Sequence, residues 1–107
     1  MEEINLKDFV LSKLEEKKAE EIKIFDTKNL HIASYIIVAN GRSIKNVSAM
    51  ADYISCEIKK KLGLNVALEG VNHSNWVVLD IQSVILHIFH PETRDYYNID
   101  DIFTKAA

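Results

Sequence analysis

Apolar residues recur at helical spacing in two stretches of the chain. In residues 4–18 the stripe consists of Leu6, Phe9, Val10 and Leu14. From Ser43 to about Leu62 it consists of Val47, Met50, Ala51, Ile54, Ile58 and Leu62. Asn5 and Ser43 are suitable N-caps, and Gly63 is a suitable stop. These patterns predict two helices, over residues 4–18 and from Ser43 to about Leu62.

Five shorter stretches have the alternating or continuous apolar patterns of β-strands, at residues 21–26, 35–39, 65–69, 76–81 and 84–90. The continuous run at 35–39 is typical of a strand covered on both faces. The link between the last two stretches is so short that they should form an antiparallel hairpin. Pro91 then favours a helical segment over 92–97. A last short segment carries Ile102 and Phe103, and residues 104–107 are expected to fray.

This order of elements predicts an α/β (α+β) fold, in which a five-stranded mixed sheet packs with helices. A right-handed crossover through the second helix would make the second and third strands parallel. The chain has 107 residues, enough for a single domain over residues 1–107. At this length a core forms without metal or disulfide staples.

Composition limits the cellular compartment and the kinds of partner that are expected. Cys56 is the only cysteine, so neither an internal disulfide nor a cysteine cluster for zinc can form, and a reducing cytoplasm is expected. The N-terminal stretch lacks signal-peptide features, and no apolar run reaches the roughly 18 residues of a membrane span. A net charge of −3 argues against a general nucleic-acid binder but leaves room for a minor RNA contact.

Catalysis is poorly supported by the residues. A strand leading into Gly41-Arg42-Ser43 and a helix resembles the phosphate cradle of nucleotidyltransferases, which follow it with two carboxylates spaced two apart on a strand. Here Asp80 is the only such acid. His87 and His90 are three apart on a strand and should face opposite ways, so a hydrogen-bonded Asp80–His87 pair is expected rather than a metal site. We therefore predict no enzyme and no cofactor.

Binding is better supported. Along residues 76–81, Val77, Leu79 and Ile81 form the cleaner core face, whereas the opposite face mixes Trp76 with Asp80. Tryptophan, tyrosine and arginine are the residue types most enriched in interface hot spots. Of Tyr96 and Tyr97, one is expected to be buried and one exposed.

Several motifs resemble the ribosomal silencing factor family (RsfS, also called Iojap). They are Gly63-Leu64, Leu68-Glu69-Gly70, WVVLD at 76–80, VILHIFHPE at 84–92 and RDYYNI at 94–99, with further similarity at 35–39, 41–43 and 51–52. The resemblance covers nearly the whole chain, and its run from His87 to Tyr97 is highly specific. Asn40, where relatives often have Thr or Ser, and Ser34, where many have Asp, depart from the pattern outside that run.

The resemblance implies a nucleotidyltransferase-like fold without the catalytic carboxylates. It also implies binding to the large ribosomal subunit, chiefly through its fourteenth protein, a basic protein on the intersubunit face. Small-subunit joining would then be blocked, and translation repressed when nutrients are short. We expect the docking surface to be drawn from Glu69, Trp76, Asp80, His87, Phe89, His90, Arg94, Tyr96 and Tyr97. The alternatives are a minimal or degenerate nucleotidyltransferase subunit and a self-associating module, and a homodimer of the free protein could share the docking surface.

Overall fold

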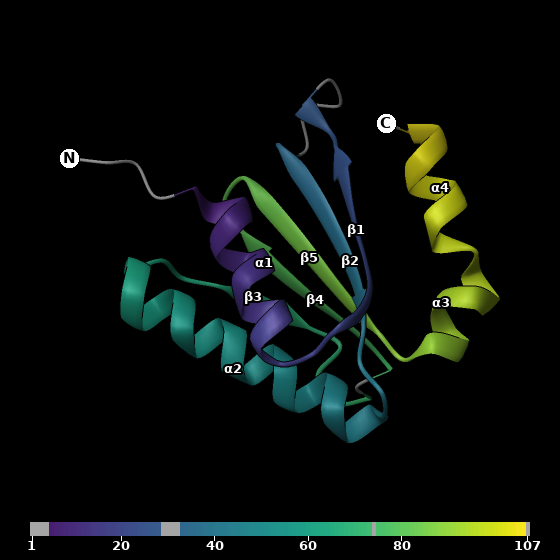
Figure 1. Cartoon of the computed structure of the whole chain (residues 1–107), viewed down its shortest axis with the longest axis horizontal. Coiled ribbons are helices and arrows are strands. Elements are labelled where there is room, and N and C mark those ends of the chain that lie inside the picture. The colour runs from purple at the N-terminus through teal and green to yellow at the C-terminus, as the bar shows by residue number, and fades with distance from the viewer. Residues whose placement is uncertain (1–4, 29–32, 74, 107) are drawn as a thin grey trace.

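A computed structural model describes residues 5–28, 33–73 and 75–106 and confirms the predicted order of elements (Figure 1). The elements are α1 (Leu6–Glu16), β1 (Glu20–Asp26), β2 (Tyr35–Asn40), α2 (Ile44–Leu62), β3 (Ala67–Glu69), β4 (Trp76–Ile81), β5 (Val84–Phe89), α3 (Pro91–Tyr97) and α4 (Ile99–Ala106). The predicted helix start at residue 4 and the tail residue 107 lie outside the described residues. The prediction of fraying at 104–106 is wrong, because α4 continues through them.

The five strands form one mixed sheet in the order β1-β2-β5-β4-β3, as the fold prediction requires. The pair β2–β5 is parallel, and every other neighbouring pair is antiparallel. The predicted β4–β5 hairpin is therefore confirmed. Strands β2 and β3 run in the same direction, as predicted, but β5 and β4 lie between them. The crossover through α2 thus joins strands that are not neighbours.

Helices lie on both faces of the sheet (Figure 1). On the first face, α1 and α2 bury the main core, which includes the predicted core face of β4, Val77, Leu79 and Ile81. On the second face, α3 and α4 cover a smaller cluster. Its buried members are Ile36, Val38, Phe89 and Ile99, and its partly buried members are Phe25, Trp76, Ile85 and Phe103.

The predicted helix signals act as expected. The Asn5 side chain accepts a hydrogen bond from the Asp8 N–H at 3.2 Å, and Ser43 Oγ accepts one from the Asn46 N–H at 3.0 Å. Gly63 ends α2 in the left-handed conformation, at a φ of 68°. The Ser43 cap and the left-handed Gly63 therefore define the two ends of α2.

Candidate partner-binding surface

The second face of the sheet is only partly covered. Over β1, β2 and one end of β5 the helices α3 and α4 bury it, so that Ile36, Val38 and Phe89 are inaccessible. Over β3 and β4 it stays open, and α3 adds exposed rings at its border. We call the following residues the open strip: Ala67, Glu69, Trp76, Val78, Asp80, Ile85, Tyr96 and Tyr97. Each of them is exposed or half-buried.

Strand register fixes the layout of the open strip. Glu69 lies beside Val78, and Ala67 lies beside Asp80. Directly paired residues of neighbouring antiparallel strands point to the same face of a sheet. Both carboxylates therefore project from the same face as Trp76, Glu69 across the strands from Val78 and Asp80 two residues along β4 from it. The result is a small apolar centre with acidic groups around it.

Aromatic rings continue the open strip from the sheet onto α3. The ring centroids of Trp76 and Phe89 are 4.9 Å apart, and those of Trp76 and Tyr97 are 5.6 Å apart. Tyr96 meets Tyr97 edge to face at 5.0 Å. Tyr96 and Tyr97 are 81% and 51% exposed, so the prediction that one of them is buried is wrong. Arg94 takes the sheet-facing side of this short helix and leaves both rings outside.

His87 is paired with Trp76 and not with Asp80. The indole Nε1–H donates to His87 Nδ1 at 3.0 Å. The register sets His87 beside Val78 and Asp80 beside Ile85, so the predicted Asp80–His87 hydrogen bond is wrong. Burial lowers the pKa of His87 to about 4, because desolvation disfavours the imidazolium. At neutral pH the ring is neutral, and its Nδ1 lone pair is available to the indole.

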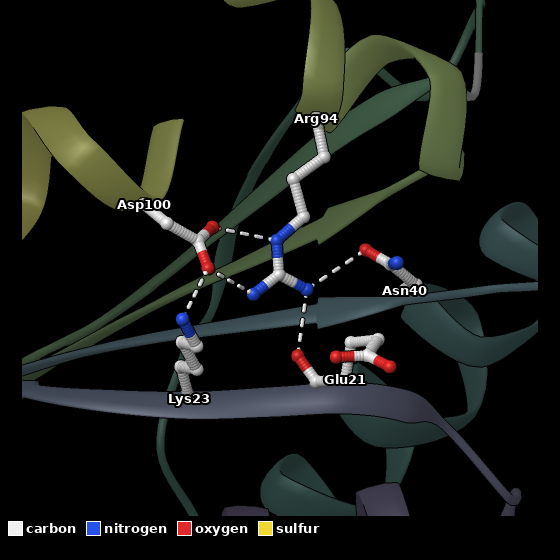
Figure 2. A network of polar contacts seen from close by, with 5 residues as sticks. All are labelled: Glu21, Lys23, Asn40, Arg94 and Asp100. Carbon is white, nitrogen blue, oxygen red and sulfur yellow. Dashed lines mark hydrogen bonds and ion pairs between the residues drawn. The ribbon is translucent and has the colours of Figure 1, made fainter. Parts of the chain in front are cut away.

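Arg94 holds α3 and α4 against the sheet (Figure 2). Its Nε and Nη2 donate to the two carboxylate oxygens of Asp100, at 2.7 and 2.9 Å. Its Nη1 donates to the Glu21 carbonyl at 2.6 Å and to Asn40 Oδ1 at 3.0 Å. Lys23 adds an ion pair to Asp100 at 2.9 Å. We call these five residues the Arg94 clasp, and it joins α3 and α4 to β1 and β2.

The Arg94 clasp also changes the acidity of Asp100. Its pKa falls to about 2, chiefly through the hydrogen bonds from Arg94 and with help from Lys23, although partial burial acts in the opposite direction. Arg94 itself is only 5% exposed. Its contribution is therefore to the position of the helices.

The structure thus revises the set of predicted docking residues. Phe89 and Arg94 are buried and offer no surface in this conformation, because they fill the interior under α3 and α4. His90 caps α3, where its Nδ1 accepts from the Glu92 N–H at 3.3 Å. Of the predicted set, Glu69, Trp76, Asp80, Tyr96 and Tyr97 lie on the open strip. Asn40, Asp100 and Lys23 were missed as partners of Arg94, and only the unusual polar Asn40 at the end of an apolar strand hinted at one.

Among the described residues, Asp80 and the turn at Gly41 do not come together as a nucleotidyl-transfer site would require. A Cβ on Gly41 would lie 2.7 Å from Val47 Cγ2, and the Arg42 N–H is already bonded to Asn46, so packing and capping explain the turn. Asp80 pairs with Ile85 of β5, which pairs with Ile36 near the start of β2. The Gly41 turn follows the other end of β2, four residues beyond Ile36, which is about 13 Å along the strand. Within the described residues no His, Cys, Asp and Glu cluster could hold a metal ion, and no helix could span a membrane.

Comparison with known proteins gives one consistent result. The family model described as ribosomal silencing factor during starvation matches residues 1–107. A ribosomal silencing factor RsfS from Zymomonas mobilis is 41% identical over 69 residues, which are 64% of this chain and 52% of that protein. Mitochondrial assembly of ribosomal large subunit protein 1 from Mus musculus is 25% identical over 94% of this chain and 46% of its own length. This chain thus spans about half of each of these two relatives.

A solved structure agrees with the sequence matches. A crystal structure of a Chromobacterium violaceum protein superimposes with a TM-score of 0.86 at 28% identity, covering 94% of this chain and 88% of that one. The shared architecture extends over nearly all of both chains. With the family model matched from the first to the last residue, this chain belongs to the ribosomal silencing factor family.

Proposed function

We propose that this protein binds the large ribosomal subunit, chiefly through its fourteenth protein, and blocks small-subunit joining by occupying the intersubunit face. Translation would then fall under nutrient limitation. Family membership supports the general role, and the mouse relative carries the large ribosomal subunit in its name. The observation that carries the proposal is the open strip, an aromatic and acidic surface on a rigid sheet. Its action is steric, takes place in the cytoplasm and needs no cofactor.

Charge on the open strip suits a basic protein partner. Glu69 and Asp80 are both exposed next to Val78, the first on the neighbouring strand β3 and the second along β4. Farther along, a hollow of about 310 Å³ is lined by Glu92, Tyr96, Tyr97, Asn75 and Thr93. A lysine or arginine entering this hollow would meet a carboxylate and the face of a tyrosine ring. Complementary charge of this kind raises association rates and fixes orientation.

Apolar contact at the centre would supply most of the affinity. Trp76 is half-buried against Phe89 and Tyr97, so its ring is held in place before binding. A preordered ring loses little conformational entropy when a partner covers it. We expect Trp76→Ala to cost roughly 2–4 kcal/mol of binding with the fold retained. If this variant unfolds, Trp76 is a core residue and its assignment as an anchor is wrong.

A charge reversal tests the acidic rim. Asp80→Lys on β4 should weaken binding to purified large subunits at least tenfold, in sedimentation at fixed salt. Asp52→Lys is the matched control, because Asp52 is an exposed carboxylate on α2, beyond the first face of the sheet. The control should bind like the wild type. Equal binding by both variants would rule out the open strip as the docking surface.

The remaining expectations follow from the same surface. An exposed apolar centre also suits pairing of two copies, so we infer that the free protein forms a homodimer that the ribosome competes against. Sedimentation velocity should show a dimer that Tyr96→Ala weakens, whereas a monomer at all concentrations would reject this. Ribosomal RNA is expected to add only minor contacts. We also infer that the sheet is a nucleotidyltransferase-like fold that has lost its catalytic acids.

A further inference from the structure

The indole nitrogen of the single tryptophan forms a hydrogen bond within the protein. Trp76 is the only Trp, and its Nε1–H donates to His87 Nδ1 at 3.0 Å. An indole has one donor and no acceptor, so this bond uses its whole hydrogen-bonding capacity. The orientation of the ring on the open strip is therefore tied to one imidazole.

We propose that His87 is a positioning residue for docking: accepting the indole hydrogen bond at Nδ1, it fixes Trp76 in the orientation presented to the partner. This inference rests on the proposed function, because it takes Trp76 as the docking anchor. His87 acts here through Trp76, and its own contact with a partner is not required. The bond also fixes the tautomer, since an accepting Nδ1 places the proton on Nε2.

His87 is itself held from several sides. It lies in β5 between Val38 of β2 and Val78 of β4, in a ladder paired on both edges. The Phe89 ring is nearly parallel to the imidazole at a centroid distance of 6.0 Å, and the Phe103 ring of α4 lies at 5.2 Å. Side chains locked by packing make precise supports for a binding residue. Helix α4 thereby contributes to the placement of Trp76 through the contact of Phe103 with His87.

Charged groups around His87 are set back from the ring. On the same face, Lys23 of β1 and Glu69 of β3 are each two strands away, at roughly 10 Å by strand spacing. Asp80 lies diagonally on β4 at roughly 8 Å. Asp100 of α4 is paired with Arg94 and Lys23. Among the described residues no carboxylate pairs with His87, and burial disfavours the imidazolium, so the ring stays neutral and remains an acceptor.

Nuclear magnetic resonance of the free protein tests the bond itself. The chain gives one indole N–H signal, so its assignment is unambiguous. His87→Leu should shift this signal and speed its exchange with solvent, and His87→Gln should restore part of the protection, because a glutamine carbonyl can accept. His73→Leu, in an exposed turn, is the control and should leave the signal unchanged. Equal protection of the indole N–H in wild type and His87→Leu would overturn the inference.

A double-mutant cycle tests whether the bond serves docking. Trp76→Phe keeps an aromatic ring but removes the donor, so it probes the same bond even if His87→Leu fails to fold. Each single variant should bind large subunits roughly five- to tenfold more weakly, and the double variant should be no weaker than Trp76→Phe alone. The inference about His87, but not the proposed function, would be overturned if the losses of affinity in the two single variants added up in the double variant. It would also be overturned if His87→Leu bound large subunits as tightly as the wild type. Absence of binding by the wild-type protein would overturn the proposed function and the docking role together, while the indole signal would still report the bond.

Discussion

Replacing Arg94 by methionine should be among the most destabilising single changes in the second layer of the molecule. The guanidinium makes four hydrogen bonds, and its side chain is only 6% exposed. Without the guanidinium, the Glu21 carbonyl and Asn40 Oδ1 each lose a hydrogen-bond donor, and each loss lowers the free energy of unfolding by about 1 kcal/mol. Asp100 keeps Lys23 and is 28% exposed, so losing its partner adds only about 1–2 kcal/mol. The expected loss in the free energy of unfolding is therefore about 3–4 kcal/mol.

Urea denaturation followed by Trp76 fluorescence measures this loss. A change of about 3 kcal/mol shifts the midpoint of a small domain by about 2 M. Lys23→Met is the matched control, because it also removes one cation from Asp100, but the lysine side chain is half-exposed. This variant should lose less than about 1 kcal/mol of the free energy of unfolding. If Arg94→Met shifts the midpoint by no more than the small change expected for Lys23→Met, the Arg94 clasp does not hold α3 and α4 in place.

Two further predictions concern the support of Trp76. Gly70 has a φ of +85°, and a Cβ there would lie 2.2 Å from the Trp76 carbonyl oxygen. Gly63 also has a positive φ, of +68°, but a Cβ there would have no neighbour within 4 Å. Gly70→Ala should therefore lower the melting temperature far more than the control Gly63→Ala. The pKa of His87 is about 4 in the folded protein against an ordinary 6.5, so the unfolded chain takes up its proton first. Stability should therefore be full above about pH 6.5 and fall by up to about 3 kcal/mol as the pH drops toward 4. His87→Gln should lose less stability than the wild type over the same fall in pH. An unchanged dependence of stability on pH would show that His87 is not the titrating group.

Local signals in the sequence predicted most elements well. Caps at Asn5 and Ser43 and the stop at Gly63 depend on side chains and backbone within a few residues, so the pattern alone predicts them. The β4–β5 hairpin follows from the short link between two apolar runs. The face of β4 with Val77, Leu79 and Ile81 was predicted as core from alternation, and it is buried.

Long-range pairings could not be predicted in this way. The parallel β2–β5 pair joins residues about fifty positions apart, and no local pattern specifies which strands become neighbours. Arg94 was predicted as a docking residue from the family signature and the enrichment of arginine in interface hot spots. Its side chain instead meets two groups far away in the sequence, the Glu21 carbonyl and Asn40, together with the nearby Asp100. The observed register places His87 opposite Val78, with Trp76 and Asp80 as its two diagonal neighbours on β4, and the hydrogen bond forms with Trp76 instead of the predicted Asp80.

The most direct test of the proposed function is a subunit-joining assay by sedimentation. Purified large subunits are first incubated with the wild-type protein or with Asp80→Lys, and small subunits are then added. The wild-type protein should sediment with the large subunits and prevent whole ribosomes from forming, whereas Asp80→Lys should allow them to form. If the wild-type protein remains in the supernatant at micromolar concentration, or sediments while joining proceeds normally, steric silencing through the open strip is contradicted.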